Sequence, residues 1–148
     1  MASVTTSCHI QADPDAVFAV IGNCNRFAEA VPDITGIEVL SDVTSGVGLR
    51  FRETRTMNGR EADTVLEVTE YEPPNHIRIV ADSHGTVWDS VFTVTPQNGG
   101  SELTLVMDAR PHKLLSRLLV PFTMRMIGGA LEKDLHAVKD FLESPVTA

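Results

Sequence analysis

The feature that most constrains the fold is a change of pattern at Pro111. Between residues 48 and 109 the sequence is a succession of alternating stretches separated by turn signals, and after Pro111 it becomes one long helical pattern. A side-chain period of two is typical of strands, whereas apolar residues three and four positions apart are typical of a helix face. The sequence therefore predicts a run of strands followed by a single long helix.

Turn signals divide the run of strands into short units. Asn58-Gly59 favours a two-residue hairpin, "EPPN" at residues 72–75 ends the next strand, and His84-Gly85 and "PQNGG" at residues 96–100 form later turns. After a first strand that ends near the Asn58-Gly59 turn, strands are predicted at about 61–71, 76–82, 86–95 and 102–109. Because strands joined by short turns pair in antiparallel order, we expect an antiparallel sheet.

The residues before position 48 add a strand, two short helices and a further strand. "SVTTSCHI" at residues 3–10 alternates apolar and polar side chains, and "GIEVL" at residues 36–40 resumes the extended pattern. Asp13 and Pro14 are typical of a helix start, and "NRFAEAV" at residues 25–31 has the spacing of a second short helix. We expect an α+β fold, a curved seven-stranded antiparallel sheet wrapped around the C-terminal helix, as one domain over residues 1–148.

The C-terminal helical pattern carries an apolar face and two features that disturb a helix. Its apolar residues at spacings of three and four are Leu115, Leu118, Leu119, Phe122, Met126, Ile127, Leu131, Leu135, Val138 and Leu142. We expect Leu118, Phe122 and Met126 to face the concave side of the sheet. Pro121 should kink or break the helix near its first third. Gly128-Gly129 requires an offsetting reason, such as close approach to the sheet, room for a ligand or local flexibility.

One face of the predicted hairpin combines apolar and charged residues. Alternation places Glu53 and Arg55 on the same face as Phe51, and the register set by Asn58-Gly59 pairs Phe51 with Leu66. A register shifted by one residue would mix apolar and charged side chains on both faces. Glu53 and Arg55 therefore lie at the polar end of an apolar concave face. Either this end opens on a cavity, or the hairpin tip projects past the helix into solvent.

Composition and charge exclude several classes of partner. The formal net charge of -8 at pH 7 argues against a nucleic-acid or anionic-membrane partner, because both need a basic surface. The sequence shows neither a signal-peptide pattern nor an apolar run long enough to span a bilayer. We therefore expect a cytoplasmic protein without integral membrane association, in which Cys8 and Cys24 are reduced thiols.

The sequence lacks the motifs of several chemistries. Its histidines show no spacing typical of metal ligands, so we expect no metal site. There is no Gly-x-Ser-x-Gly elbow, no phosphate-binding glycine loop and no Cys-x-x-Cys pair. We therefore expect no cofactor. The oligomeric state is left open, a homodimer included.

Several segments together resemble a known family. They are "SCHIQADPDAVFAVI", "GVGLRFRETRTMNGREADTVLEVTEYEPPNHIRIV", "GGSELTLVMDARP" and "LLSRLLVPFTMRMIGGALEKDLHAVKDFLE". From about residue 4 to residue 142 the chain is similar to the polyketide cyclase/dehydratase and lipid-transport group of the START-like (SRPBCC) superfamily. That superfamily shares the helix-grip fold of the major birch pollen allergen. The resemblance implies a long, mostly apolar cavity between the sheet and the C-terminal helix.

The implied cavity suggests a binding protein. We expect binding or transport of a hydrophobic or amphipathic small molecule such as a lipid, polyketide or isoprenoid, with Glu53, Arg55 and Ser90 orienting a polar group of the ligand. The expected apolar contacts are Phe51, Leu66, Trp88, Phe92, Met107, Leu118, Phe122 and Met126. Each of these apolar residues is equally compatible with ordinary core packing. Asp89, on the opposite strand face from Trp88, is expected to be solvated.

Two other functions stay open. In a polyketide cyclase/dehydratase, Glu53 would act as a general base or Arg55 would stabilise an enolate, although one carboxylate and one guanidinium are a small acid–base set. The third function is a protein-interaction module without a ligand. A collapsed cavity, or an exposed apolar patch near the early helices or the "VPF" segment at residues 120–122, would favour that function.

Overall fold

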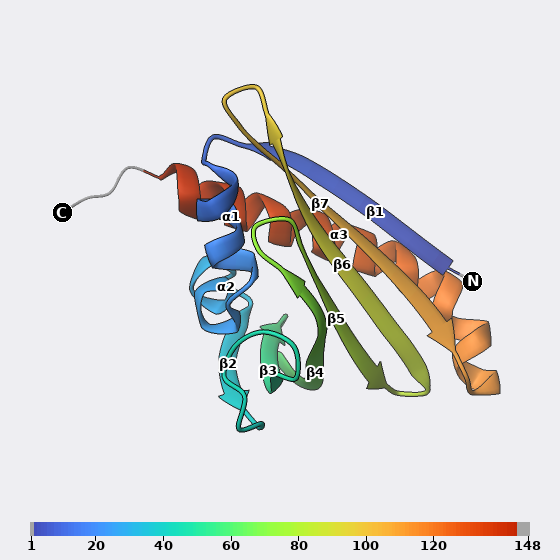
Figure 1. Cartoon of the computed structure of the whole chain (residues 1–148). Helices are drawn as coiled ribbons and strands as arrows, with labels where there is room; N and C mark the ends of the chain where they lie inside the picture. Colours follow the sequence, from blue (N-terminus) through green and yellow to red (C-terminus); the bar gives the residue numbers. More distant parts are fainter. Residues whose placement is uncertain (1, 145–148) are drawn as a thin grey trace.

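A single sheet and a long helix dominate the computed structural model, which describes residues 2–144 (Figure 1). The strands are β1 (Ala2–Ile10), β2 (Ile34–Val39), β3 (Arg50–Met57), β4 (Arg60–Glu72), β5 (His76–Ser83), β6 (Thr86–Gln97) and β7 (Gly100–Pro111). The helices are α1 (Pro14–Ile21), α2 (Cys24–Ala30) and α3 (Leu114–Glu143). The seven strands pair in antiparallel fashion in the order β1-β7-β6-β5-β4-β3-β2. This arrangement is the helix-grip fold and confirms the predicted fold class.

The β3–β4 hairpin has the register predicted from its turn. Asn58 and Gly59 adopt positive φ angles of 53° and 77°, which a two-residue turn of this kind requires of both central residues. Phe51 consequently pairs with Leu66, as expected from the sequence. Every second side chain of β3 is therefore directed to the concave face of the sheet, where α3 lies.

The two short helices lie between β1 and β2 and cover one end of the concave face (Figure 1). The side chain of Asn23 caps α2, because its Oδ1 accepts hydrogen bonds from the backbone N–H groups of Asn25 at 3.0 Å and Arg26 at 3.2 Å. Phe27 of α2 makes an edge-to-face contact with Phe92 of β6, with ring centroids 5.8 Å apart. This aromatic contact fixes α2 against the sheet.

The second half of α3 supplies the part of the helix that belongs to the core. Leu131, Leu135 and Val138 are buried against the sheet, and the helix contacts β1 more extensively than any other strand. The helix is continuous through Pro121, so the predicted break is absent. Pro121 lies on the exposed side of the helix, where water can satisfy the carbonyl group that has lost its N–H donor.

The prediction that Leu118, Phe122 and Met126 face the sheet is wrong. Their exposed fractions are 65%, 75% and 78%, and the side chains directed inward from this part of α3 are Val120 and Met124. The first half of α3 is apolar on both sides, so a spacing of three and four residues fits either side equally well. Only the packing of the helix on the sheet determines which stripe is buried.

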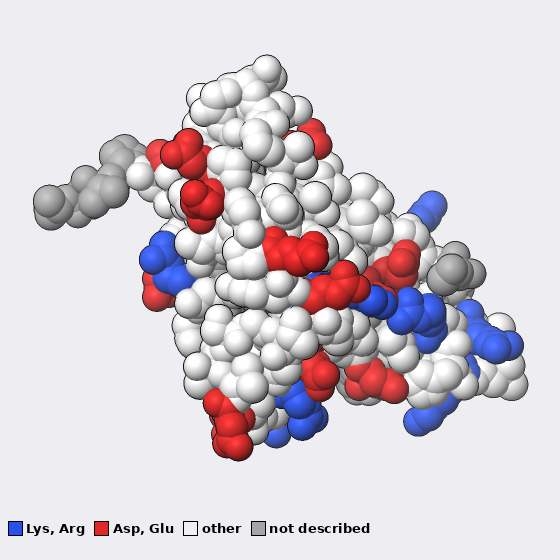
Figure 2. Space-filling model, viewed as in Figure 1, with Lys and Arg blue, Asp and Glu red and all other residues white. Residues whose placement is uncertain are grey.

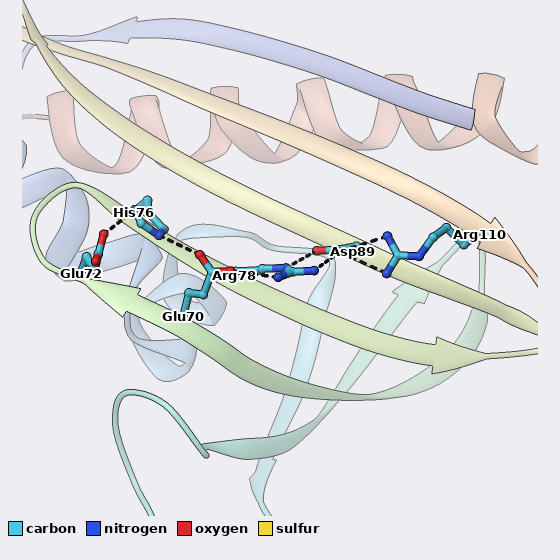
Figure 3. Close-up of polar contacts among 6 residues, drawn as sticks. All are labelled: Glu70, Glu72, His76, Arg78, Asp89 and Arg110. Carbon is cyan, nitrogen blue, oxygen red and sulfur yellow. Dashed lines mark hydrogen bonds and ion pairs between the residues drawn. The ribbon is translucent and has the colours of Figure 1, made fainter. Parts of the chain in front are cut away.

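The face of the sheet opposite α3 carries a network of ion pairs. Asp89 was expected to be solvated, but its residue is only 5% exposed because Arg78 and Arg110 lie over its carboxylate. Arg78 donates to Asp89 from Nε at 2.9 Å and from Nη2 at 2.6 Å. Figure 2 shows acidic and basic side chains interspersed on this face. The contacts join Glu72, His76, Glu70, Arg78, Asp89 and Arg110 in one chain (Figure 3).

Candidate functional site

A cavity of about 300 Å³ lies between the concave face of the sheet and the second half of α3. Ile21, Cys24 and Phe27, from the segment of the two short helices, line one end of it. Most of its wall is apolar and comes from β3 to β7 and from α3. The apolar lining consists chiefly of Leu49, Phe51, Leu66, Val68, Ile77, Ile79, Trp88, Phe92, Leu105, Met107, Ile127 and Leu131.

Three charged side chains meet in the wall of this cavity. Arg55 of β3 donates from Nε to Glu53 Oε1 at 2.7 Å, and from Nη1 and Nη2 to the two carboxylate oxygens of Asp134 at 3.0 and 2.8 Å. The exposed fractions of the side chains are 20% for Arg55, 15% for Glu53 and 6% for Asp134. The bidentate pair joins the strand that forms one wall to the helix that forms the opposite wall.

The electrostatics of this Glu53–Arg55–Asp134 cluster follow from its composition. Burial by itself lowers the pKa of Arg55, but hydrogen bonds and charges from Asp134 and Glu53 outweigh burial and raise that pKa above its ordinary value. Arg55 is therefore always charged. With both carboxylates ionised, the cluster has a formal net charge of one negative unit.

Most residues predicted from the sequence to contact a ligand line the cavity. They are Phe51, Glu53, Arg55, Leu66, Trp88, Ser90, Phe92 and Met107. Glu53 and Arg55 form part of the cavity wall, so the alternative in which the hairpin tip carries them into solvent is wrong. Leu118, Phe122 and Met126 are not among the lining residues, because the first half of α3 directs them away from the sheet. That any lining residue binds a ligand stays a prediction.

Asp134 is the member of the charged cluster that was not predicted from the sequence. Asp134 is three residues after Leu131 and four before Val138, so it lies on the stripe of α3 that is buried. A carboxylate on a buried stripe needs a partner, and the predicted concave face already held Arg55. The combination of a charged residue on each of two facing elements was the signal that could have found the pair.

The remaining polar groups of the cavity are neutral hydroxyls and a thiol. Thr64, Ser83 and Ser90 bring hydroxyl groups to the wall, and Cys24 brings its Sγ. Burial raises the pKa of the Cys24 thiol, so this thiol is protonated at neutral pH. Within residues 2–144, no group of three or more His, Cys, Asp or Glu side chains is arranged to hold a metal ion.

The sequence matches one family model over nearly its whole length. A family model described as "Polyketide cyclase / dehydrase and lipid transport" matches residues 1–143. No curated protein shows significant sequence similarity to this chain.

Solved structures share the fold over nearly the whole length of the chain. A START superfamily protein from Mycobacterium smegmatis superposes with a TM-score of 0.78 at 16% identity, covering 95% of this chain and 97% of the other. Ara h 8.0201 superposes with a TM-score of 0.73 at 12% identity, with 97% and 99% covered. The di-domain ARO/CYC BexL from the BE-7585A biosynthetic pathway has a TM-score of 0.80 at 14% identity, covering 97% of this chain and 50% of BexL. At these identities the likeness shows the fold alone.

Proposed function

The chain belongs to the polyketide cyclase/dehydrase and lipid transport family, and from this membership we propose that it binds a hydrophobic or amphipathic small molecule in the cavity between the sheet and α3. A lipid, polyketide or isoprenoid would have the required chemistry. The single observation that carries the proposal is an apolar cavity whose charged groups are concentrated in one cluster. A volume of about 300 Å³ is at the lower end of the range of ligand pockets.

The charged cluster selects the polar end of the ligand. Glu53 Oε2 makes no hydrogen bond to any of the described residues, so it can accept one from a ligand donor. A ligand carboxylate would instead approach a cluster with a net negative charge, which disfavours fatty acids. The proposed ligand therefore has an apolar body and a neutral group with an O–H or N–H donor, such as an alcohol or a phenol.

The same geometry favours binding over cyclisation. In a cyclase, Arg55 would stabilise an enolate, but Asp134 and Glu53 already neutralise its charge. Glu53 would act as a base, yet one of its oxygens is held by Arg55. If a polyketide-like substrate is found, Glu53→Gln tests this alternative, because a base at Glu53 requires turnover to be lost while binding persists.

Native mass spectrometry of protein purified without detergent tests the proposal first. We expect a bound small molecule in addition to the 16.1 kDa chain. Titration with decanol and decanoate then tests selectivity, and decanol should bind more tightly because it donates a hydrogen bond and carries no charge. The proposal fails if the purified protein is empty and neither compound binds. Tighter binding of decanoate would overturn the role given to the cluster.

A pair of variants tests whether decanol binds in the cavity. Ala130 lines the cavity from α3, whereas His136 on the same helix is exposed. Ala130→Phe should fill part of the space and weaken decanol binding by at least about tenfold. Excluding about two methylene groups of decanol from the cavity is enough for an effect of this size. His136→Phe adds the same ring to the surface and should leave decanol binding unchanged. Equal binding by both variants would show that decanol binds elsewhere.

A further inference from the structure

The first half of α3 carries an apolar stripe that nothing in the described chain covers. We call this set of side chains the outer stripe: Leu115, Leu118, Leu119, Phe122 and Met126, with exposed fractions of 67%, 65%, 51%, 75% and 78%. Their spacing places them together on the side of α3 opposite the buried Val120 and Met124. Single exposed apolar residues are common on soluble proteins, but a contiguous group of large ones marks an interaction surface.

Unpaired cations lie in the same segment as the outer stripe, and by helical spacing Arg125 borders the stripe beside Leu118, whereas Arg117 lies on the side of Val120. Lys113, Arg117 and Arg125 are exposed, and none of them forms an ion pair with another of the described residues. The sequence between positions 109 and 131 contains no Asp or Glu, although the whole chain has a net charge of -8. Figure 2 shows Lys and Arg side chains gathered at the end of the molecule where α3 begins. The charge of this segment is therefore opposite to that of the protein.

We propose that residues 113–126, which comprise the N-cap and the first half of α3, dock the protein on the surface of an anionic lipid bilayer. A helix with large apolar side chains on one side and Lys and Arg on the rest of its exposed surface lies in the interface between headgroups and acyl chains. Each cation near an anionic membrane strengthens binding by about fivefold. The sequence expectation against such a partner was based on net charge, whereas the attraction depends on the local charge within about 10 Å of the surface.

The helix lies on the bilayer and does not cross it. α3 as a whole is long and apolar enough to span a membrane by length and composition. Its second half, however, is held in the core by Leu131, Leu135 and the Arg55–Asp134 pair. The exposed segment alone is about 20 Å long, which is shorter than the roughly 30 Å of a hydrocarbon core.

Charge also argues against a second copy of this chain as the occupant. In a two-fold dimer, the same surface patch of each copy meets its counterpart. Arg125, which borders the outer stripe, would then lie against a segment of the other copy that contains cations and no acidic residue to offset its charge. An anionic lipid surface supplies the opposite charge that the segment lacks.

The docking segment continues directly into the cavity wall. Ile127, Ala130 and Leu131 line the cavity, and they follow Met126 on the same helix. A docked molecule would therefore hold its cavity next to the bilayer surface. The docking itself does not depend on whether the cavity is occupied.

Vesicle flotation tests the proposal on the intact chain. We expect binding to vesicles rich in phosphatidylglycerol, weakening as salt is raised, and little binding to pure phosphatidylcholine. Arg125→Glu should weaken binding by about 30-fold, because it changes the charge beside the outer stripe by two units. Arg60→Glu makes the same change at an exposed residue after the β3–β4 turn and should leave binding within about twofold.

A second pair of variants tests the outer stripe. Leu118→Ser should weaken vesicle binding by at least about tenfold. Val47→Ser removes an apolar side chain of similar exposure, 60% against 65%, from the β2–β3 loop and should have no effect. Since both side chains are exposed, both variants should keep the melting temperature of the unmodified protein, so a loss of folding cannot imitate a loss of docking.

Several outcomes would overturn the proposal. The unmodified protein could fail to float with anionic vesicles at low salt. Leu118→Ser could bind these vesicles as well as Val47→Ser does. Sedimentation could also show a dimer that Leu118→Ser abolishes, which would assign the outer stripe to a second copy. A tryptophan placed at Phe122 in a Trp88→Phe background should shift its emission to shorter wavelength only with anionic vesicles, and no shift would contradict docking.

Discussion

At the scale of single residues, the structure depends on two buried carboxylates that guanidinium groups hold from opposite sides of the sheet. Asp134 is bound by Arg55 inside the cavity, and Asp89 is bound by Arg78 and Arg110 on the outer face. A buried pair is weak support for stability as a whole, but removing one partner leaves a charge that is both desolvated and unpaired. Removing one partner of either pair should therefore lower the free energy of unfolding more than removing one partner of an exposed ion pair would.

Removing Asp134 should destabilise the protein. Asp134→Ala leaves Arg55 with Glu53 alone, and we expect the free energy of unfolding in urea to fall by about 3 kcal/mol. Asp140→Ala is the control on the exposed side of the same helix and should change it by less than about 0.5 kcal/mol. Equal effects of the two variants would contradict the importance of the pair.

Replacing the whole cluster should separate stability from selectivity. The triple variant Glu53→Gln, Arg55→Met and Asp134→Leu leaves no unpaired charge, so it should recover most of the stability that Asp134→Ala loses. It should also lose the preference for decanol over decanoate. A triple variant that retained the preference would show that other groups select the ligand.

The pH dependence of stability should reflect Asp89. Hydrogen bonding from Arg78 lowers the pKa of Asp89, burial opposes this, and Arg110 lowers it further. A carboxyl whose pKa is lower in the folded state stabilises the fold above its ordinary pKa near 4, and this contribution is lost as the pH falls through the folded-state value. Asp89→Asn should therefore be less stable at pH 7 and should lose less stability on acidification. Urea unfolding at several pH values measures both effects, with Asp140→Asn as the control.

At the scale of elements, the two halves of the continuous helix α3 differ in their environment. Its second half belongs to the core, whereas its first half carries the outer stripe. The two halves meet near Gly128-Gly129. A Cβ at Gly128 would meet only Val4 Cγ1, at 3.8 Å, and one at Gly129 would meet nothing within 4 Å. Close approach to the sheet is therefore not the reason for these glycines.

Replacing Gly129 with Ala should stabilise the protein. Ala is favoured over Gly in a helix interior by about 1 kcal/mol, and the structure offers space for the methyl group. The melting temperature measures this gain. Gly85→Ala is the opposite case, since its φ is +81° and its Cβ would lie 2.6 Å from Ser116 Oγ, so this change should lower the melting temperature. If Gly129→Ala also lowered it, the helix would need the freedom of a glycine there.

The elements differ in how far the sequence could predict them. The β3–β4 register followed from local turn chemistry, because Asn58 and Gly59 accept the positive φ angles of a tight hairpin. The buried face of α3 did not follow, because its first half is apolar on both sides and only the distant β1 and β7 decide which side is covered. Asp134 was missed for the same reason, since its partner Arg55 is 79 positions away in the sequence.

At the scale of the whole molecule, ligand binding should stabilise the fold as one unit. The cavity is bounded by strands, by the short helices and by α3, so a molecule bound in it would contact elements from most of the chain. A ligand at a hundred times its dissociation constant adds about 2.7 kcal/mol to the stability of a protein that binds it only when folded. Decanol should therefore raise the melting temperature of the unmodified protein and of His136→Phe, but not of Ala130→Phe. An equal rise in all three would place decanol outside the cavity.

The pairing of β1 with β7 has a consequence for the order in which the molecule assembles during synthesis. Ala2 pairs with Ala109 and Ile10 with Ser101, so β1 is translated about a hundred residues before β7, the strand it pairs with in the sheet. The hairpins from β3 to β7 can each form as soon as their second strand leaves the ribosome, because their contacts are local. β1 can pair only after β7 has been translated, and α3, the helix that covers β1, is translated after β7. We expect the first strand to be among the last to acquire its native partners, and a ribosome stalled before β7 should present β1 to chaperones and proteases.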